Sequence, residues 1–138
     1  MFAAALGGGA TLNGKPITVT TAPKLRGAEI LAARPVMQSE VWETGFPGFI
    51  RVYRPSLAYR LSLVGQGRFD GMLTLRPTWE WDIAAGALIV TEAGGAVSTR
   101  IGGDLVFNNP VPKVNGVVAA GSQAHAQIIA ALRPVHAA

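Results

Sequence analysis

A carboxylate at the start of a predicted helix is the clearest candidate for chemistry in this sequence. Asp82 is followed by small and apolar residues up to Glu92, and Gly94 and Gly95 come directly after. An acid before such a run and glycines behind it are typical of the two ends of a helix. The helix dipole stabilises an ionised carboxylate there, and an ionised carboxylate can bind a hard cation. Asp82 is therefore a candidate metal ligand, although a plain helix cap would explain the same residue.

Arginines gather in the stretch that precedes this helix, where the only acid is Asp70. They are Arg51, Arg54, Arg60, Arg68 and Arg76. Guanidinium groups recognise phosphate by paired, charge-assisted hydrogen bonds. Some of the five could meet a phosphate group, but at least three of them are expected to be ordinary surface residues.

The remaining residues with reactive or aromatic side chains point to structural roles. His125 and His136 have no partner at ligand spacing, so neither is expected to bind metal or act as a base. Trp42, Trp79 and Trp81 are most simply core or interface aromatics, with stacking of Trp79 on an adenine as an alternative. The chain has no cysteine, which excludes disulfides, cysteine-based zinc sites and thiol catalysis.

Composition narrows the class of protein. A chain of 138 residues fits one domain with a single core, here residues 1–138. Its 49% hydrophobic and 14% charged residues exclude a disordered chain. The net charge of +4 permits an anionic ligand, but no run of Lys and Arg indicates nucleic acid. Without a signal segment or a bilayer-length apolar stretch, a soluble cytoplasmic protein with no membrane contact is expected.

Helical and strand patterns alternate along the chain, which predicts an α/β fold with a layered mixed sheet and flanking helices. The predicted helices cover residues 38–44, 57–64 with Ser56 as N-cap, 82–92 and 124–132. The predicted strands cover residues 17–20, 49–53, 72–75 with Pro77 closing the strand, 96–98 and 117–120. Residues 28–33 fit a helix or a strand equally well.

Residues 81–95, Trp-Asp followed by small residues and then Glu-Ala-Gly-Gly, closely resemble the second signature motif of the inositol monophosphatase superfamily. The resemblance extends to most of the chain. Residues 7–17 resemble the glycine-rich hairpin of these enzymes, residues 56–70 the helix and strand that line the substrate pocket, and residues 115–120 the last strand.

This resemblance implies a magnesium-dependent phosphomonoesterase, a class that lithium often inhibits. The motif aspartate, here Asp82, is one of the metal ligands in the family. The other ligands come from an N-terminal glutamate and an Asp-Pro-x-Asp-Gly-Thr motif, and neither is present in this sequence. The chain is therefore expected to be the C-terminal, substrate-side half of the fold. It should be inactive alone, because Mg²⁺ needs several oxygen ligands.

The resemblance also suggests which residues face a small phosphorylated substrate. The segment Pro-Thr-Trp-Glu-Trp-Asp that contains Thr78 resembles the 3'(2'),5'-bisphosphate nucleotidase branch, and Arg60 falls where that branch has a lysine. Ser56 could contact substrate or act only as a cap. Inositol-specific members carry an acid where this chain has Leu75. Where the bisphosphate nucleotidase branch carries an arginine, this chain has Thr74. Inositol phosphates and bisphosphonucleosides therefore both remain candidate substrates.

Two hypotheses follow about the role of the chain. It can be half of an enzyme whose partner is the missing N-terminal half, or a truncated, non-catalytic homologue that binds or assembles, with a second copy as partner. In either case the surfaces at residues 81–85 and 72–75 are expected to be bare. The chain alone is then expected to self-associate or to be poorly soluble.

Overall fold

The computed structural model describes residues 1–134 and contains a three-stranded sheet, a five-stranded sheet and three α-helices. The strands are β1 (Phe2–Ala5), β2 (Gly9–Leu12), β3 (Lys15–Pro16), β4 (Glu29–Leu31), β5 (Ile50–Val52), β6 (Gly71–Trp79), β7 (Gly95–Ser98) and β8 (Lys113–Gly121). The helices are α1 (Leu57–Gln66), α2 (Glu80–Glu92) and α3 (Ser122–Ala131), with 3₁₀ turns η1 (Arg34–Met37) and η2 (Ser39–Val41). Among residues 1–134, no helix is both long and apolar enough to cross a bilayer.

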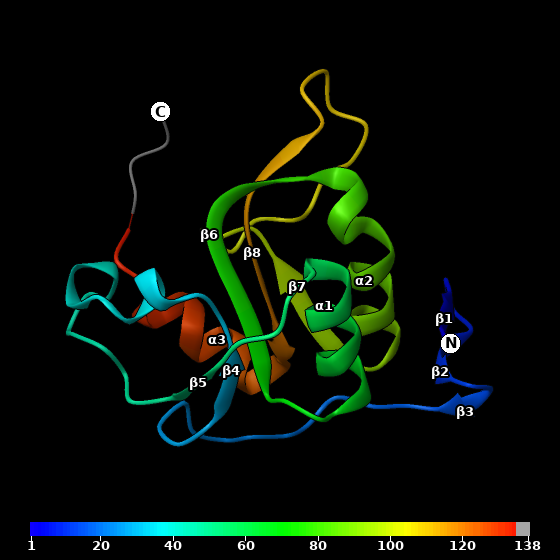
Figure 1. Cartoon of the computed structure of the whole chain (residues 1–138), viewed down its shortest axis with the longest axis horizontal. Coiled ribbons are helices and arrows are strands. Elements are labelled where there is room, and N and C mark those ends of the chain that lie inside the picture. The colour runs from blue at the N-terminus through cyan, green and yellow to red at the C-terminus, as the bar shows by residue number, and fades with distance from the viewer. Residues whose placement is uncertain (135–138) are drawn as a thin grey trace.

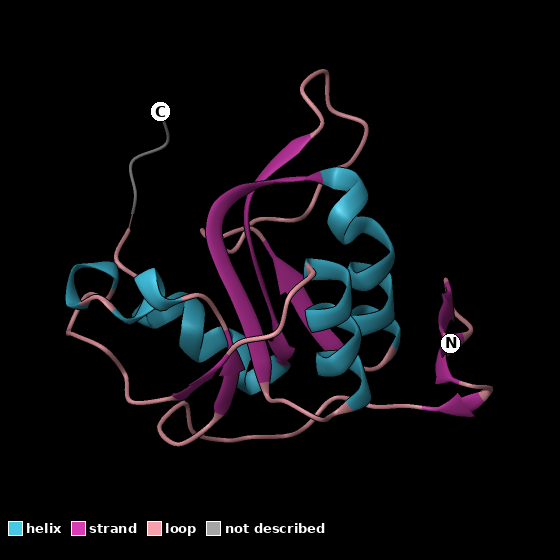
Figure 2. Ribbon diagram, in the orientation of Figure 1, coloured by secondary structure: helices cyan, strands magenta, loops and turns pink. Residues whose placement is uncertain are grey.

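The larger sheet is mixed, as the sequence predicts. Its strand order is β5-β4-β6-β8-β7, with β4 parallel to both β5 and β6, while β8 runs antiparallel to β6 and β7. Helices α1 and α2 lie side by side on one face, and α3 covers the other (Figure 1). Figure 2 shows the same layering by element type, with the small sheet beyond α2.

Side chains of β8 point alternately to the two faces of the sheet and contribute to the apolar cluster on each face. Val117 and Ala119 belong to the apolar cluster shared with α1 and α2, whereas Val118 and Ala120 belong to the cluster shared with α3. All four are fully buried. Successive side chains of a strand point to opposite faces, so a strand buried on both sides is apolar throughout.

The glycine-rich segment at the N-terminus forms a hairpin that is attached to the C-terminal end of α2. Asn13 and Gly14 both have positive φ and form the two-residue turn between β2 and β3. The backbone N–H of Gly9 donates to the Glu92 carboxylate at 2.9 Å, and the N–H of Val19 donates to the Ala93 carbonyl at 3.1 Å. Glu92, near the end of the signature motif, therefore connects this motif to the glycine-rich hairpin.

Two of the predicted elements differ in the structure, and a third, undecided segment is resolved by it. Residues 17–20 are not a strand, because β3 ends at Pro16 and the chain then crosses to the larger sheet. Residues 38–44 do not form a helix but the 3₁₀ turn η2 and a turn after it. The undecided segment 28–33 contains the strand β4.

Strand β6 also continues past Pro77, which was expected to close it. Strand β4 pairs only with Gly71 and Met72 of β6, so Pro77 lies where β6 has no neighbour on that side. A proline is tolerated in a strand where its missing N–H is not needed by a neighbour. The expected bare surface at 72–75 is contradicted for Met72 and Leu73, which are fully buried. Thr74 and Leu75 are half-buried and lie where β6 has no neighbour on the β4 side.

Helices α1 and α2 approach each other closely because glycines face the contact. A Cβ atom placed on Gly86 would lie 2.6 Å from the Cβ of Leu61, and one on Gly65 would lie 2.8 Å from a methyl group of Ile89. Neither distance is sterically allowed, so both positions depend on the absence of a side chain.

We predict that Gly86→Val lowers the free energy of unfolding by about 2 kcal/mol or more, because it overpacks this contact. Urea denaturation of the variant measures the change. The matched control is Ala85→Ser, an exposed position on the same helix, which should stay within about 0.5 kcal/mol of the native chain. An unchanged midpoint for Gly86→Val would show that the two helices lie farther apart.

Candidate functional site

A pocket of about 360 Å³ opens where the parallel strands β4 and β5 end and the first turns of α1 and α2 begin. Beyond Met72, β6 has no neighbour on the β4 side, which leaves room for the pocket. Ligands of α/β sheets commonly bind at the carboxyl ends of the strands. The lining residues are Ala33, Tyr53, Leu57, Arg60, Thr74, Arg76, Pro77, Thr78, Trp79 and Asp82.

Asp82 is exposed in the first turn of α2, as the sequence predicts for the start of this helix. It is not the cap, because the helix already begins at Glu80 and Trp79 is the N-cap residue without a side-chain hydrogen bond. The Asp82 carboxylate therefore does not serve as the N-cap of α2. It lies at the positive end of the helix dipole and lines the pocket.

The residues of this pocket do not fit a magnesium ion by themselves. Within residues 1–134, no group of three His, Asp or Glu side chains is placed to hold a metal. The other charged residues of the pocket are the cations Arg60 and Arg76. Mg²⁺ requires an octahedral set of oxygens, so Asp82 can supply only one of its ligands.

Arg60 is held in place at the pocket wall. It is 8% exposed, its Nε–H donates to the Arg54 carbonyl at 2.5 Å, and its guanidinium lies 4.8 Å from the centre of the Tyr53 ring. Such contacts orient a guanidinium before any ligand arrives. Arg76 is exposed and lines the same pocket.

The other three arginines do not line this pocket, which agrees with the expectation for at least three of the five. Arg51 donates to the Ala32 carbonyl, Arg54 donates to the Tyr53 carbonyl, and Arg68 is exposed.

Thr78 carries a hydroxyl group with an unmet hydrogen-bonding capacity. The residue is 6% exposed, and its Oγ1 atom has no hydrogen-bond partner within the described residues 1–134. A buried polar atom without a partner costs about 1–3 kcal/mol. Thr78 lines the pocket, but its Oγ1 atom is buried, so a ligand there can supply the missing partner only once the side chain turns toward the pocket.

Ser56, the third predicted substrate-side residue, lies outside the pocket lining. It caps α1 as the sequence predicts, because the Tyr59 N–H donates to its Oγ at 3.2 Å. Its φ of 70° is unusual for a residue other than glycine. The structure thus places Asp82, Arg60 and Thr78 together and Ser56 apart.

The tryptophans near Asp82 form a stack at the surface. Trp79 and Trp81 are parallel, with ring centroids 4.7 Å apart, and the Lys113 ammonium lies 4.3 Å from the Trp79 centroid. Since Trp81 covers one face of Trp79, the ammonium lies on the other face. This leaves no free face for the adenine stacking that was an alternative for Trp79. Trp42, in contrast, is fully buried in the core.

Glu80 is a second carboxylate near Asp82, but it is directed away from the pocket. It accepts hydrogen bonds from the N–H of Asn108 (2.6 Å), the N–H of Asn109 (3.1 Å) and the Asn109 Nδ2 (2.7 Å). Burial by itself raises the pKa of Glu80, but the side-chain and backbone hydrogen bonds of Asn109 and Asn108 outweigh it, so that the pKa lies below its ordinary value. Glu80 is therefore ionised, and its carboxylate is already engaged by Asn108 and Asn109.

His125 has a partner that sequence spacing does not reveal. Its Nε2 lies 2.7 Å from the Ser98 Oγ, which donates to the Thr99 carbonyl, so the network assigns the proton to Nε2. Burial lowers the pKa of His125. Because the serine gives its own proton to a carbonyl, the pair links α3 to β7 and does not form an activated nucleophile.

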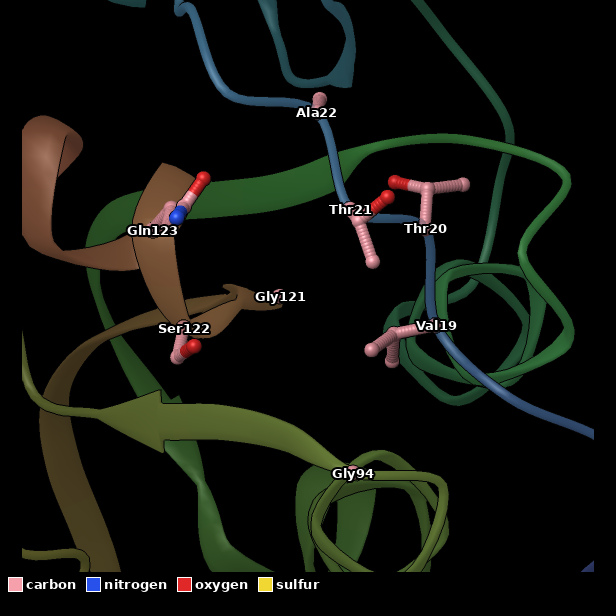
Figure 3. A pocket seen from close by; sticks show the side chains of 8 residues that line it. All are labelled: Val19, Thr20, Thr21, Ala22, Gly94, Gly121, Ser122 and Gln123. Atoms are coloured by element: carbon pink, nitrogen blue, oxygen red, sulfur yellow. The ribbon is translucent and has the colours of Figure 1, made fainter.

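A second hollow, of about 180 Å³, lies where residues 19–22 cross the start of α3 (Figure 3). It is lined by Val19, Thr20, Thr21, Ala22, Gly94, Gly121, Ser122 and Gln123. None of these side chains is charged, and none of the predicted site residues is among them. The pocket at Asp82 is therefore the stronger candidate.

Comparison with known proteins supports the resemblance to one family. The model of the inositol monophosphatase family matches residues 1–137. The phosphatase IMPL1 of Arabidopsis thaliana is 35% identical over 127 residues, which cover 85% of this chain and 34% of that protein. The Nus factor SuhB of Escherichia coli is 36% identical over 128 residues, covering 80% of this chain and 46% of SuhB.

A solved structure shows the same arrangement of elements. The extragenic suppressor protein SuhB from Bartonella henselae superposes with a TM-score of 0.72 at 27% identity, over 94% of this chain and 52% of that one. The chain thus spans about half the length of the relatives it matches, or less. The resemblance predicted from residues 81–95 is confirmed at the level of the family, without selecting the bisphosphate nucleotidase branch. The chain belongs to the inositol monophosphatase family.

Proposed function

We propose that the complete protein hydrolyses small phosphate monoesters with the help of Mg²⁺ and that this chain supplies the substrate-side half of the site. One observation carries the proposal. A single pocket is lined by Asp82, by the cations Arg60 and Arg76, and by Thr78, whose buried hydroxyl has no partner within residues 1–134.

Each of these side chains has a role that its chemistry supports. Arg60 and Arg76 can bind anionic oxygens by charge-assisted hydrogen bonds. Thr78 can donate its hydroxyl proton to a substrate oxygen once its side chain turns toward the pocket. Asp82 contributes one oxygen to a cation whose other ligands belong to another part of the protein. This chain therefore binds and orients a substrate, but it cannot assemble the metal site alone.

The charge of the pocket favours a substrate with two anionic groups. Two arginines line the pocket. Leu75, where inositol-specific relatives carry an acid, is half-buried against the apolar cluster under α3 and does not line the pocket. A 3'(2'),5'-bisphosphonucleoside offers a second phosphate for the arginines, while an inositol monophosphate offers neutral hydroxyl groups. We therefore favour the bisphosphate class over inositol phosphates.

Activity should depend on metal ligands that this chain lacks. The chain alone should show negligible Mg²⁺-dependent turnover of inositol 1-phosphate or adenosine 3',5'-bisphosphate, because Asp82 is a single ligand. Joined to the N-terminal half of a relative, it should gain activity that Asp82→Asn removes and that Asp104→Asn, an exposed acid outside the pocket, leaves unchanged. Robust turnover by the chain alone, abolished by Asp82→Asn, would contradict the proposal.

A further prediction tests the substrate class in the joined enzyme. Arg76→Gln should raise KM for adenosine 3',5'-bisphosphate by about 10-fold or more, since it removes a charged hydrogen-bond donor, and should change KM for inositol 1-phosphate much less. Arg68→Gln, an exposed arginine outside the pocket, is the matched control. Equal effects of Arg76→Gln on both substrates would argue against recognition of a second phosphate.

A second candidate function is assembly with another protein, without catalysis. Trp81 is 66% exposed, and the loop that lines a hollow beside it also exposes Val106 and Val111. Exposed apolar patches of this kind mark association surfaces. The SuhB relatives are named Nus factors, which also allows a role in a larger assembly.

The chain alone should therefore self-associate at tens of micromolar, and Trp81→Gln should reduce the association. Light scattering coupled to size exclusion measures the mass. Val97→Thr, at a half-buried position away from the tryptophans, is a suitable control. A monodisperse monomer with cooperative unfolding would show that the exposed tryptophans are not an association surface.

A further inference from the structure

The connection between β7 and β8, residues 99–112, is attached to the very first residue of α2. Glu80 is helix position one, and its backbone N–H donates to the Pro112 carbonyl at 2.9 Å. Its side chain accepts the three hydrogen bonds from Asn108 and Asn109. A single residue thus makes four hydrogen bonds to this loop.

These contacts use three of the about four acceptor positions of the Glu80 carboxylate. One carboxylate oxygen accepts from Asn108 and the other accepts twice from Asn109, and the residue is only 8% exposed. The Asn109 amide also donates to the Val106 carbonyl, which closes the loop on itself. Asn108 has a φ of 65°, a conformation that asparagine tolerates and that belongs to the turn presenting both N–H groups. Charge-assisted hydrogen bonds of this type are stronger than neutral ones.

The attachment lies next to residues that have candidate functional roles. Asp82 follows Glu80 by two positions, and the stacked Trp79 and Trp81 flank it in sequence. Lys113, which caps the stack, comes directly after the loop. Trp81 also lines a hollow of about 520 Å³ together with Asn108 and Pro112. A loop that moved away would release the first helical turn and the aromatic stack together.

We propose that Glu80 is a positioning residue, which locks loop 99–112 onto the first turn of α2 and so fixes Asp82 and the Trp79–Trp81 stack. It does not bind metal or substrate itself. The part that concerns Asp82 as a ligand rests on the proposed function, whereas the lock on the loop and the stack does not depend on it.

The test compares three variants of the full chain. Glu80→Ala removes all side-chain acceptors, and Glu80→Gln keeps one oxygen acceptor. Glu92→Gln is the matched control, because Glu92 ends the same helix and accepts one backbone N–H, from Gly9. The readouts are hydrogen exchange at the backbone amides of Asn108 and Asn109 and the circular dichroism of the coupled tryptophan pair.

Glu80→Ala should accelerate exchange at both amides by about tenfold or more and weaken the signal of the tryptophan pair. Glu80→Gln should produce the same changes to a smaller degree, and Glu92→Gln should produce neither. If Glu80→Ala does not fold, the graded change in Glu80→Gln decides. Native protection of both amides in Glu80→Gln, or a tryptophan signal that responds equally to Glu92→Gln, would overturn the proposal.

The catalytic consequence has a separate readout. In the joined enzyme, Glu80→Gln should lower kcat more than it raises KM, because Asp82 is displaced while the arginines keep their places. If the native joined enzyme has no turnover, the proposed function fails while the exchange result still stands. If turnover is present but kcat is unchanged in a variant whose loop has opened, Glu80 does not position Asp82.

Discussion

The change from strand to helix without an intervening loop is the constraint on which the candidate site depends. Strand β6 ends at Trp79 and helix α2 begins at Glu80. Thr78 on the strand and Asp82 on the helix therefore lie only four residues apart and line the same pocket. The Glu80 N–H is one of the donors that lack a partner at a helix start, and it donates to the Pro112 carbonyl of loop 99–112.

The contact between the two helices adds the cationic side of the pocket. The Gly86 backbone lies against Leu61 of α1, and the neighbouring residue on that helix is Arg60. A larger residue at position 86 would move α1, and the Arg60 guanidinium would move with it. The small residues of the signature motif therefore have a structural cause, since they set the distance between the arginine of one helix and the aspartate of the other. At the C-terminal end of α2, the Glu92 carboxylate accepts the Gly9 N–H and so attaches the N-terminal hairpin to this helix.

The parts of the molecule that the sequence predicted are those governed by local rules. The start of α2, the serine cap of α1 and the Asn13-Gly14 turn depend on residues next to each other, and the mixed α/β sheet follows from the order of the elements. The length of β6 was underestimated because a proline such as Pro77 normally ends a strand. Here the lack of a neighbouring strand on one side allows the proline within β6. The pairs Glu80–Asn109 and Ser98–His125 join residues 27 or more positions apart, so no local pattern could reveal them.

We expect the pocket beside Asp82 to receive the phosphorylated substrate and the hollow at the start of α3 to stay empty. The most direct test is an NMR titration of the ¹⁵N-labelled chain with adenosine 3',5'-bisphosphate. Binding in this pocket should give saturable shifts that are confined to residues such as Tyr53, Arg60 and Thr78 and that are lost in Arg60→Gln. Shifts centred on Thr20 and Ser122, or shifts that persist unchanged in Arg60→Gln, would contradict it.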